Sequence, residues 1–156
     1  MSDPQNGDPV VVLVVGIGNV PRELLAAAEQ ILGPLPHVEA VCFEPTRTPD
    51  VVYDRIRKHV DALDRGGGVL IIADLCGSTL ANAGYRLAEE RDNCEVLCGA
   101  NLAMLMRLFS VDRTRLNAGE LGEALAETGR RGINLCSEKR CGTAAVQRAL
   151  EEGEES

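Results

Sequence analysis

An unbroken apolar run, Val10–Val15, lies near the start of the chain and ends at Gly16. A run of this length without polar alternation is typical of a strand that is buried on both faces, as in a parallel sheet covered by helices. Strand-like segments follow at Val38–Phe43, Val69–Ala73 and Glu95–Cys98. Buried strands at this spacing constrain the fold more than any other feature of the sequence.

Helical patterns separate these strand-like segments. Asn19 and Pro21 precede the amphipathic stretch Arg22–Leu32, which favours a helix with a capped start. Further helices are expected over Thr48 to Leu63, from Ser78 or Thr79 to Glu90, from Asn101 to Leu108, and over Glu120 to Arg130. Because strand and helix alternate with short connections, the sequence predicts an α/β, doubly wound fold with a mainly parallel sheet and helices on both faces.

The chain has 156 residues, which suits one domain. We expect a disordered segment over residues 1–9, the folded domain over residues 10–137, and a helical, acidic tail over residues 138–156. The formal net charge of -8 and an aromatic content of 3% argue against nucleic-acid binding, which needs basic surface or stacking side chains.

The start of the chain carries no feature of a targeting segment. Residues 1–9 are polar, with no basic start and no apolar core, and Val10–Val15 is too short to cross a bilayer. A cytoplasmic location and no direct membrane insertion are therefore expected. The six cysteines are correspondingly expected to be reduced thiols.

In sheets of this kind, ligands meet the loops at the carboxyl ends of the strands. The loops in question are Gly16–Asn19, Phe43–Thr48, Asp74–Thr79 and Gly99–Asn101. The loop that opens with Asp74 has small residues and two hydroxyls at a helix start, where free backbone N–H groups can hold an anion such as a phosphoryl group. Helix capping alone would also explain Ser78 and Thr79.

Other functional patterns in these loops are weaker. The turn at Gly16 and Gly18 resembles the start of a dinucleotide-binding fingerprint, and Glu44 could then be the acid that binds the ribose. However, Pro21 occupies the position of the third glycine, so the two glycines are better explained by a tight turn. An acyl-phosphate receiver with Asp74 as acceptor would need a neighbouring acidic pair after the first strand, and none is present.

The cysteines and histidines do not complete a metal site. Cys94 and Cys98 share one face of a strand, but no paired motif or histidine cluster joins them. Cys76 lies at a helix start, where the pKa of a thiol can fall, although a small loop residue is the simpler interpretation. His37 and His59 fall away from the ligand loops. No metal and no cofactor are expected.

Taken together, the segments resemble the IIA domain of the mannose/fructose/sorbose family of the bacterial phosphoenolpyruvate-dependent sugar phosphotransferase system (PTS). The family's opening strand, Ser-His-Gly-Asn turn and Leu/Ala-rich helix are matched by VVGIGNVPRELLAAAEQILG. Its later motifs are matched by Val38–Phe43, Gly68–Asn82, Gly99–Leu105 and Gly129–Ile133. The likeness is collinear from Val10 to Asn134.

The resemblance implies a four-stranded parallel sheet in the order 2-1-3-4, with a late edge strand, here Ile133–Cys136, exchanged between the subunits of a homodimer. It also implies phosphoryl relay: a histidine after the first strand takes phosphate from a small carrier and passes it to a IIB partner. An aspartate after the third strand orients the imidazole, and a hydroxyl with loop amides holds the phosphoryl oxygens.

Carried over by position, Asp74 matches the supporting aspartate, Thr79 the serine, and Gly18 with Asn19 the turn, while Ile17 occupies the histidine position. Other positions depart from the family pattern. Gly16 stands where the family has a serine before the histidine, and Ser78, after Gly77, stands where it has the second of two glycines. Leu80 and Ala103 stand where it has prolines. The implied phosphate loop is thus Gly16, Gly18, Asn19, Asp74, Gly77, Ser78 and Thr79.

An isoleucine cannot accept a phosphoryl group. The sequence therefore favours a degenerate, regulatory or binding subunit, without activity in phosphoryl relay, whose partners would be a PTS carrier or a IIB-type protein. The alternative is a phosphoryl-transfer component of sugar uptake with a relocated acceptor, Cys76 or Thr79. Nucleotide binding by the glycine turn is a weaker third hypothesis.

Overall fold

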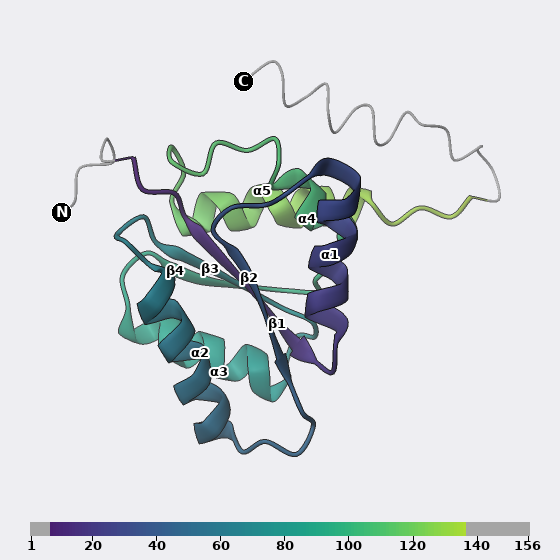
Figure 1. Cartoon of the computed structure of the whole chain (residues 1–156). Helices are drawn as coiled ribbons and strands as arrows, with labels where there is room; N and C mark the ends of the chain where they lie inside the picture. The colour runs from purple at the N-terminus through teal and green to yellow at the C-terminus, as the bar shows by residue number, and fades with distance from the viewer. Residues whose placement is uncertain (1–6, 137–156) are drawn as a thin grey trace.

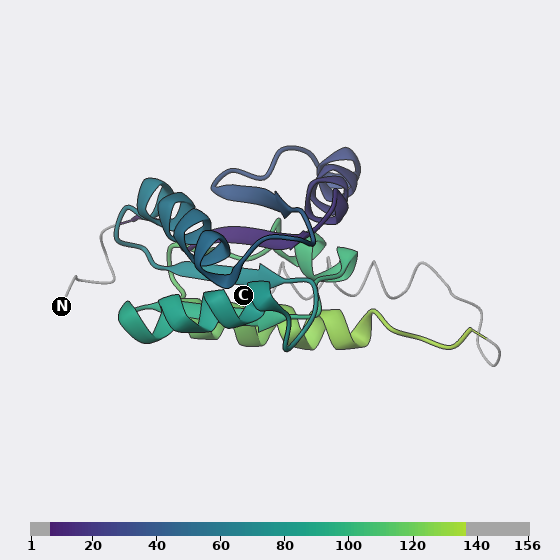
Figure 2. The same cartoon turned by 90° about the horizontal axis from the view of Figure 1, so that it is seen from below.

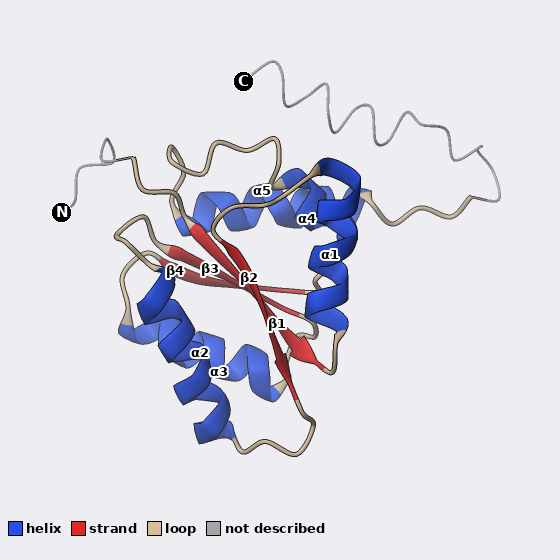
Figure 3. Ribbon diagram, in the orientation of Figure 1, coloured by secondary structure: helices blue, strands red, loops and turns tan. Residues whose placement is uncertain are grey.

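The computed structural model describes residues 7–136 and shows alternating strands and helices (Figure 3). The elements are β1 (Val11–Ile17), α1 (Val20–Leu32), β2 (Val38–Phe43), α2 (Pro49–Leu63), β3 (Val69–Ala73), α3 (Thr79–Glu90), β4 (Cys94–Cys98), α4 (Leu102–Arg107) and α5 (Ala118–Arg131). Of the expected segment 1–9, only residues 7–9 are described, and the expected tail 138–156 lies outside the described residues.

The strands form a four-stranded sheet in the order β2-β1-β3-β4, and every neighbouring pair is parallel. The predicted order 2-1-3-4 is therefore confirmed. The expected fourth strand starts one residue earlier than predicted, at Cys94. The stretch Ile133–Cys136 is not a strand in the single chain, and its Ile133 and Leu135 side chains are exposed.

Helices cover both faces of the sheet, α2 and α3 on one side and α1, α4 and α5 on the other (Figure 1). Seen from below, α2 and α3 lie side by side across one face (Figure 2). Along β1, Val11, Leu13 and Val15 pack toward α2 and α3, while Val12 and Val14 pack toward the other layer. The run that opens the fold is thus buried on both faces, as its sequence predicts.

Side chains cap three of the helices at the residues that the sequence predicts. Thr48 accepts a hydrogen bond from the Val51 N–H and Asn101 accepts one from the Met104 N–H, at 3.4 and 3.1 Å. Of the two candidates at the start of α3, Ser78 is the cap. The expected cap at Asn19 is wrong, because its side chain makes no capping hydrogen bond to α1.

The most complete cap opens α5, and it yields a testable prediction. The Asn117 side chain accepts from the Glu120 N–H and the Glu120 carboxylate accepts from the Asn117 N–H, both at 2.9 Å. We expect Asn117→Ala to lower the free energy of unfolding by about 1 kcal/mol, because the Glu120 N–H loses its side-chain acceptor at the start of the helix. Urea denaturation measures the change. Asn117→Asp, the matched control, should stay near wild type, and an equal loss in both variants would contradict the capping role.

Candidate functional site

The parallel strands bring the expected ligand loops to one edge of the sheet. Ile17 is in register with Phe43 at the ends of β1 and β2, and Ala73 is in register with Cys98 at the ends of β3 and β4. The loops that follow these residues leave the sheet at the same edge. The structure therefore brings together residues that the sequence places far apart.

The turn after β1 is held by backbone hydrogen bonds. The Ile17 N–H donates to Oδ2 of Asp74 at 3.0 Å, and the Gly18 N–H donates to the Phe43 carbonyl at 2.9 Å. Gly18 has a φ of 63°, in the left-handed region that favours glycine. The two hydrogen bonds fix the turn against β2 and β3, and they leave the Ile17 side chain 39% exposed.

Gly16 is required by the closeness of its neighbours. A Cβ atom at this position would lie 2.8 Å from Cγ of Pro21 and 3.1 Å from Oδ2 of Asp74. A side chain here would therefore collide with the start of α1 or displace the carboxylate. The glycine is explained by packing, without any bound dinucleotide.

Asp74 lies at the junction of β1 and β3. Its N–H donates to the Val15 carbonyl at 3.1 Å, and Oδ2 accepts the Ile17 N–H. Its other carboxylate oxygen, Oδ1, is shielded from solvent and has no hydrogen-bond partner among residues 7–136. A buried carboxylate oxygen without a donor costs free energy, so this arrangement of Asp74 is unfavourable in the isolated chain.

The loop between β3 and α3 contains a tight turn, in which the Ser78 N–H approaches the Leu75 carbonyl at 3.3 Å and Gly77 has a φ of 79°. The Ser78 hydroxyl accepts the Ala81 N–H at 3.1 Å, so helix capping accounts for it. Thr79 begins α3 with an exposed side chain. Gly77, Ser78 and Thr79 thus follow Asp74 at the same edge, as the sequence predicts.

Three aliphatic side chains near Asp74 are exposed. Ile17 is 39% exposed and Leu75 is 66% exposed, and Val20 of α1 is also exposed. Exposed aliphatic side chains that gather at a ligand edge are typical of a surface that meets another protein. Asn19 is exposed beside them.

A hollow of about 300 Å³ lies next to the Gly18–Asn19 turn, and sequence reasoning did not predict it. Arg47 pairs with Glu44 at 3.5 Å, so Glu44 faces a cation rather than serving as a free ribose acceptor. The Arg55 guanidinium donates to the Cys42 carbonyl at 2.8 Å and stacks over the ring of Phe43. The expected loop Phe43–Thr48 contains Arg47, whereas Arg55 lies within α2 and only the fold brings it in.

The cysteines only partly follow the expectation of reduced thiols. Cys42, Cys76, Cys94 and Cys98 are free, whereas Cys136 is disulfide-bonded. The expectation of a reduced thiol is therefore wrong for Cys136. It was drawn from the expected cytoplasmic location, which says nothing about whether two particular cysteines lie close enough to pair.

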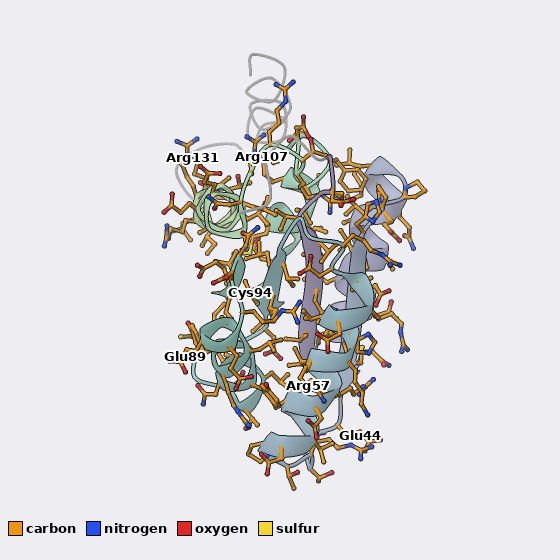
Figure 4. The ribbon with its side chains drawn as sticks, turned by 90° about the vertical axis from the view of Figure 1, so that its left-hand side faces the viewer. Glu44, Arg57, Glu89, Cys94, Arg107 and Arg131 are labelled. Atoms are coloured by element: carbon orange, nitrogen blue, oxygen red, sulfur yellow. The ribbon has the colours of Figure 1, made fainter. Side chains whose placement is uncertain are left out.

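Cys94 and Cys98 do share one face of β4, toward α3. Figure 4 shows Cys94 in the interior of the molecule, with Glu44 far from it at one end. Burial raises the pKa of Cys94 to about 11, so this thiol stays protonated near neutral pH. Within residues 7–136, no three or more His, Cys, Asp or Glu side chains gather where they could hold a metal ion. The helices described there are also too short or too polar to span a bilayer.

Comparison with known proteins identifies the fold and its relatives. The family model described as PTS system fructose IIA component matches residues 11–126. The chain is 28% identical over 130 residues to the PTS system mannose-specific EIIAB component of Escherichia coli (strain K12), covering 83% of this chain and 40% of that protein. The chain thus spans well under half of this relative. It is 26% identical to the PTS system sorbose-specific EIIA component of Lacticaseibacillus casei, of which it covers 91%.

Solved structures agree with these relatives. The phosphotransferase system component EIIA from Streptococcus agalactiae superposes with a TM-score of 0.73 at 25% identity, covering 83% of this chain and 99% of that one. The mannose/sorbose specific IIA subunit from Enterococcus faecalis superposes with a TM-score of 0.75 at 20% identity, covering 86% of this chain and all of that one, and shows likeness of fold.

Proposed function

Since the chain belongs to the family described as the PTS system fructose IIA component, we propose that it serves a sugar phosphotransferase system as a binding or regulatory subunit that does not itself carry the phosphoryl group. Its partner in this proposal is a PTS phosphocarrier or a IIB-type protein. A cytoplasmic location is part of the same proposal.

The observation that carries the proposal is an isoleucine beside a retained aspartate. Ile17 offers no nucleophile at the position where the resemblance places the histidine. Asp74 is still present, and its Oδ2 is occupied by the Ile17 backbone N–H. Its Oδ1 has no donor among the described residues, which is what a carboxylate would show after losing a ring N–H partner.

The apolar surface supports binding rather than transfer. Ile17 and Leu75 expose aliphatic area on either side of Asp74. A phosphoryl group is stabilised by cations and N–H donors, whereas a protein partner gains from burying apolar side chains. Loss of the histidine and gain of an aliphatic side chain at the same position therefore favour a docking role.

A relocated acceptor is the second candidate. Cys76 and Thr79 are both exposed in the loop that follows Asp74, and each has a nucleophilic atom. Transfer to Cys76 would form a sulfur–phosphorus bond as the nitrogen–phosphorus bond of the donor phosphohistidine breaks, and the thiol proton would leave to solvent or to the released imidazole. Transfer to Thr79 would require the hydroxyl proton to leave as the oxygen–phosphorus bond forms, and Asp74 is the nearest carboxylate in the loop.

We also propose that the protein is a homodimer. β4 lies at an open edge of the sheet. Just beyond α5, Ile133 is 78% exposed and Leu135 is 87% exposed. An open strand edge and a nearby apolar segment can satisfy each other between two copies of the chain.

Phosphorylation by the upstream PTS carriers, with labelled phosphoenolpyruvate, tests the proposed function. Wild-type protein should take up no label, because Ile17 has no acceptor atom. Ile17→His should gain acid-labile label, since Asp74 can accept the ring N–H, and adding Asp74→Ala should weaken that gain. Ile17→Leu is the matched control and should remain unlabelled.

The label's chemistry separates the two candidates. Stoichiometric, acid-labile label on wild-type protein would contradict the proposal of a non-carrying subunit. Acid-stable label on Thr79, lost in Thr79→Ala, or thiophosphate on Cys76, lost in Cys76→Ser, would instead establish the relocated acceptor.

A further inference from the structure

Two thiols meet at the β3–β4 corner of the sheet. Cys98 is the last residue of β4 and is in register with Ala73, the last residue of β3. Cys76 follows Ala73 by one short turn and is exposed. Neither the resemblance nor the capping of α3 requires a cysteine at either position.

Cys98 has Tyr85 and Cys76 as neighbours. Its Sγ lies 3.9 Å from the Tyr85 hydroxyl, which reaches over from α3. Burial raises the pKa of the Cys98 thiol, whereas the hydrogen bond with Tyr85 lowers it. The neighbouring Cys76 thiol and Asp74 carboxylate also raise this pKa. The same two cysteines also raise the pKa of Tyr85. Cys76, Cys98 and Tyr85 therefore form one cluster.

The two thiols differ in ways that suit an attacking and a resolving cysteine. Cys76 is exposed in a turn whose next residue, Gly77, has a φ of 79°, so the turn is reachable by a small oxidant. Cys98 is half-buried on a strand and is less accessible. An exposed thiol beside a second thiol is the arrangement in which oxidation ends in a disulfide instead of higher oxides.

We propose that Cys76 and Cys98 are a redox-modification site, which a hydroperoxide converts to a reversible disulfide tying the β3–α3 loop to the end of β4. The Cys76 thiolate attacks a peroxide oxygen and the O–O bond breaks, giving a sulfenic acid and water or an alcohol. The Cys98 thiol then attacks the Cys76 sulfur, releasing the sulfenic oxygen as water and forming the S–S bond. Both thiols are oxidised by two electrons in all, and one peroxide is reduced.

The disulfide would fix the loop that contains Asp74, Ser78 and Thr79. That loop is now held to the rest of the edge by the Ile17–Asp74 hydrogen bond and by the start of α3. A covalent link to β4 would reduce the conformations open to Leu75 and its neighbours. The modification concerns the thiols alone and does not depend on whether the chain carries phosphate.

Cys94 supplies a matched control within the same strand. It lies on the same face of β4 as Cys98 but at the opposite end, is 5% exposed, and has a pKa raised to about 11 by burial. It should not react with peroxide. Trypsin releases Cys94 and Cys98 in one peptide, residues 92–107, and Cys76 in another, residues 66–86.

The full-length protein is reduced with dithiothreitol, desalted, treated with hydrogen peroxide at a few equivalents, blocked with iodoacetamide and digested without reductant. We expect the peptides 66–86 and 92–107 to appear linked, with the loss of two hydrogen atoms, and to separate again with dithiothreitol. Cys76→Ser and Cys98→Ser should each abolish the linked species, and Cys94→Ser should leave it at the wild-type yield. Peptide mapping keeps the Cys136 disulfide out of the measurement.

Two results would overturn the proposal. One is a linked species that persists in Cys98→Ser and disappears in Cys94→Ser, which would assign the bond to the wrong end of β4. The other is unlinked wild-type peptide in which Cys76 carries two or three oxygen atoms, which would show that Cys98 does not resolve the sulfenic acid. Neither result bears on phosphate labelling, so the two proposals can fail separately.

Discussion

Arg113→Met should lower the free energy of unfolding by about 3 kcal/mol, since it removes charge-assisted hydrogen bonds and leaves carbonyl groups at a buried junction without their donor. The Arg113 side chain is 8% exposed, and its guanidinium donates to the carbonyls of Val10 at 3.1 Å, Pro36 at 2.6 Å and His37 at 3.4 Å. These contacts join the start of β1 to the loop before β2. Burial lowers the pKa of Arg113 from its ordinary value, and the carbonyls offset that desolvation.

Urea denaturation measures this loss as a fall in the midpoint with little change in slope. The neighbouring Arg115 supplies the matched control, because its side chain is exposed and its ion pair is a local one, with Asp112 at 3.3 Å, three residues away. Arg115→Met should stay within about 0.5 kcal/mol of wild type. Similar losses in the two variants would contradict a structural role for the Arg113 contacts.

Truncation after Gly132 should convert a dimer to a monomer and lower the melting temperature, because it removes Ile133–Cys136, the proposed exchanged segment. Multi-angle light scattering at micromolar concentrations measures the molar mass in solution, which should fall from that of two chains to that of one. Deleting Glu151–Ser156 alone should change neither quantity.

Truncation also removes Cys136 and its disulfide, so a second variant isolates the apolar contact. Ile133→Asp combined with Leu135→Asp retains the cysteine and adds charge where an interface would be apolar. We expect this double variant to be monomeric as well. A full-length protein that already has the mass of one chain would contradict the proposed homodimer.

The sequence predicted most of the fold because its information is local. Apolar runs such as Val10–Val15 and Val69–Ala73 are long enough for strands, and the residues between them have helical spacing. Capping residues such as Thr48 and Asn101 marked helix starts closely. Strand boundaries are less local: β4 begins with Cys94 because this residue pairs in register with Val69 of β3, a partner far away in the sequence.

The candidate site was predicted only where its residues lie in loops at strand ends. Asp74 and the turn at Gly16 and Gly18 were found in this way, and their contact required only parallel strands. The environment of Arg55 could not be predicted, because a residue inside a helix carries no mark of which strand end it faces. Arg113 contacts Val10 from 103 positions away, and no periodicity encodes such a pair.

The neighbours of Cys98 show the same limit. Sequence reasoning placed this residue on the correct face of its strand, but the position of Tyr85 beside its sulfur could not be predicted, because it depends on how α3 packs. Likewise, the exposure of Cys76 was foreseeable, whereas its contact with Cys98 depends on the β3–β4 register.

The fit around Gly16 couples the choice of residue at two positions. A Cβ there would lie 2.8 Å from Cγ of Pro21, so the proline ring or the nearby backbone would have to shift to admit it. The serine that the resemblance places at position 16 would therefore strain the present contact with Pro21, although each residue alone is an ordinary choice. The effect of a substitution at position 16 should accordingly depend on the residue at position 21, so that substitutions scored singly at either position would misjudge the pair.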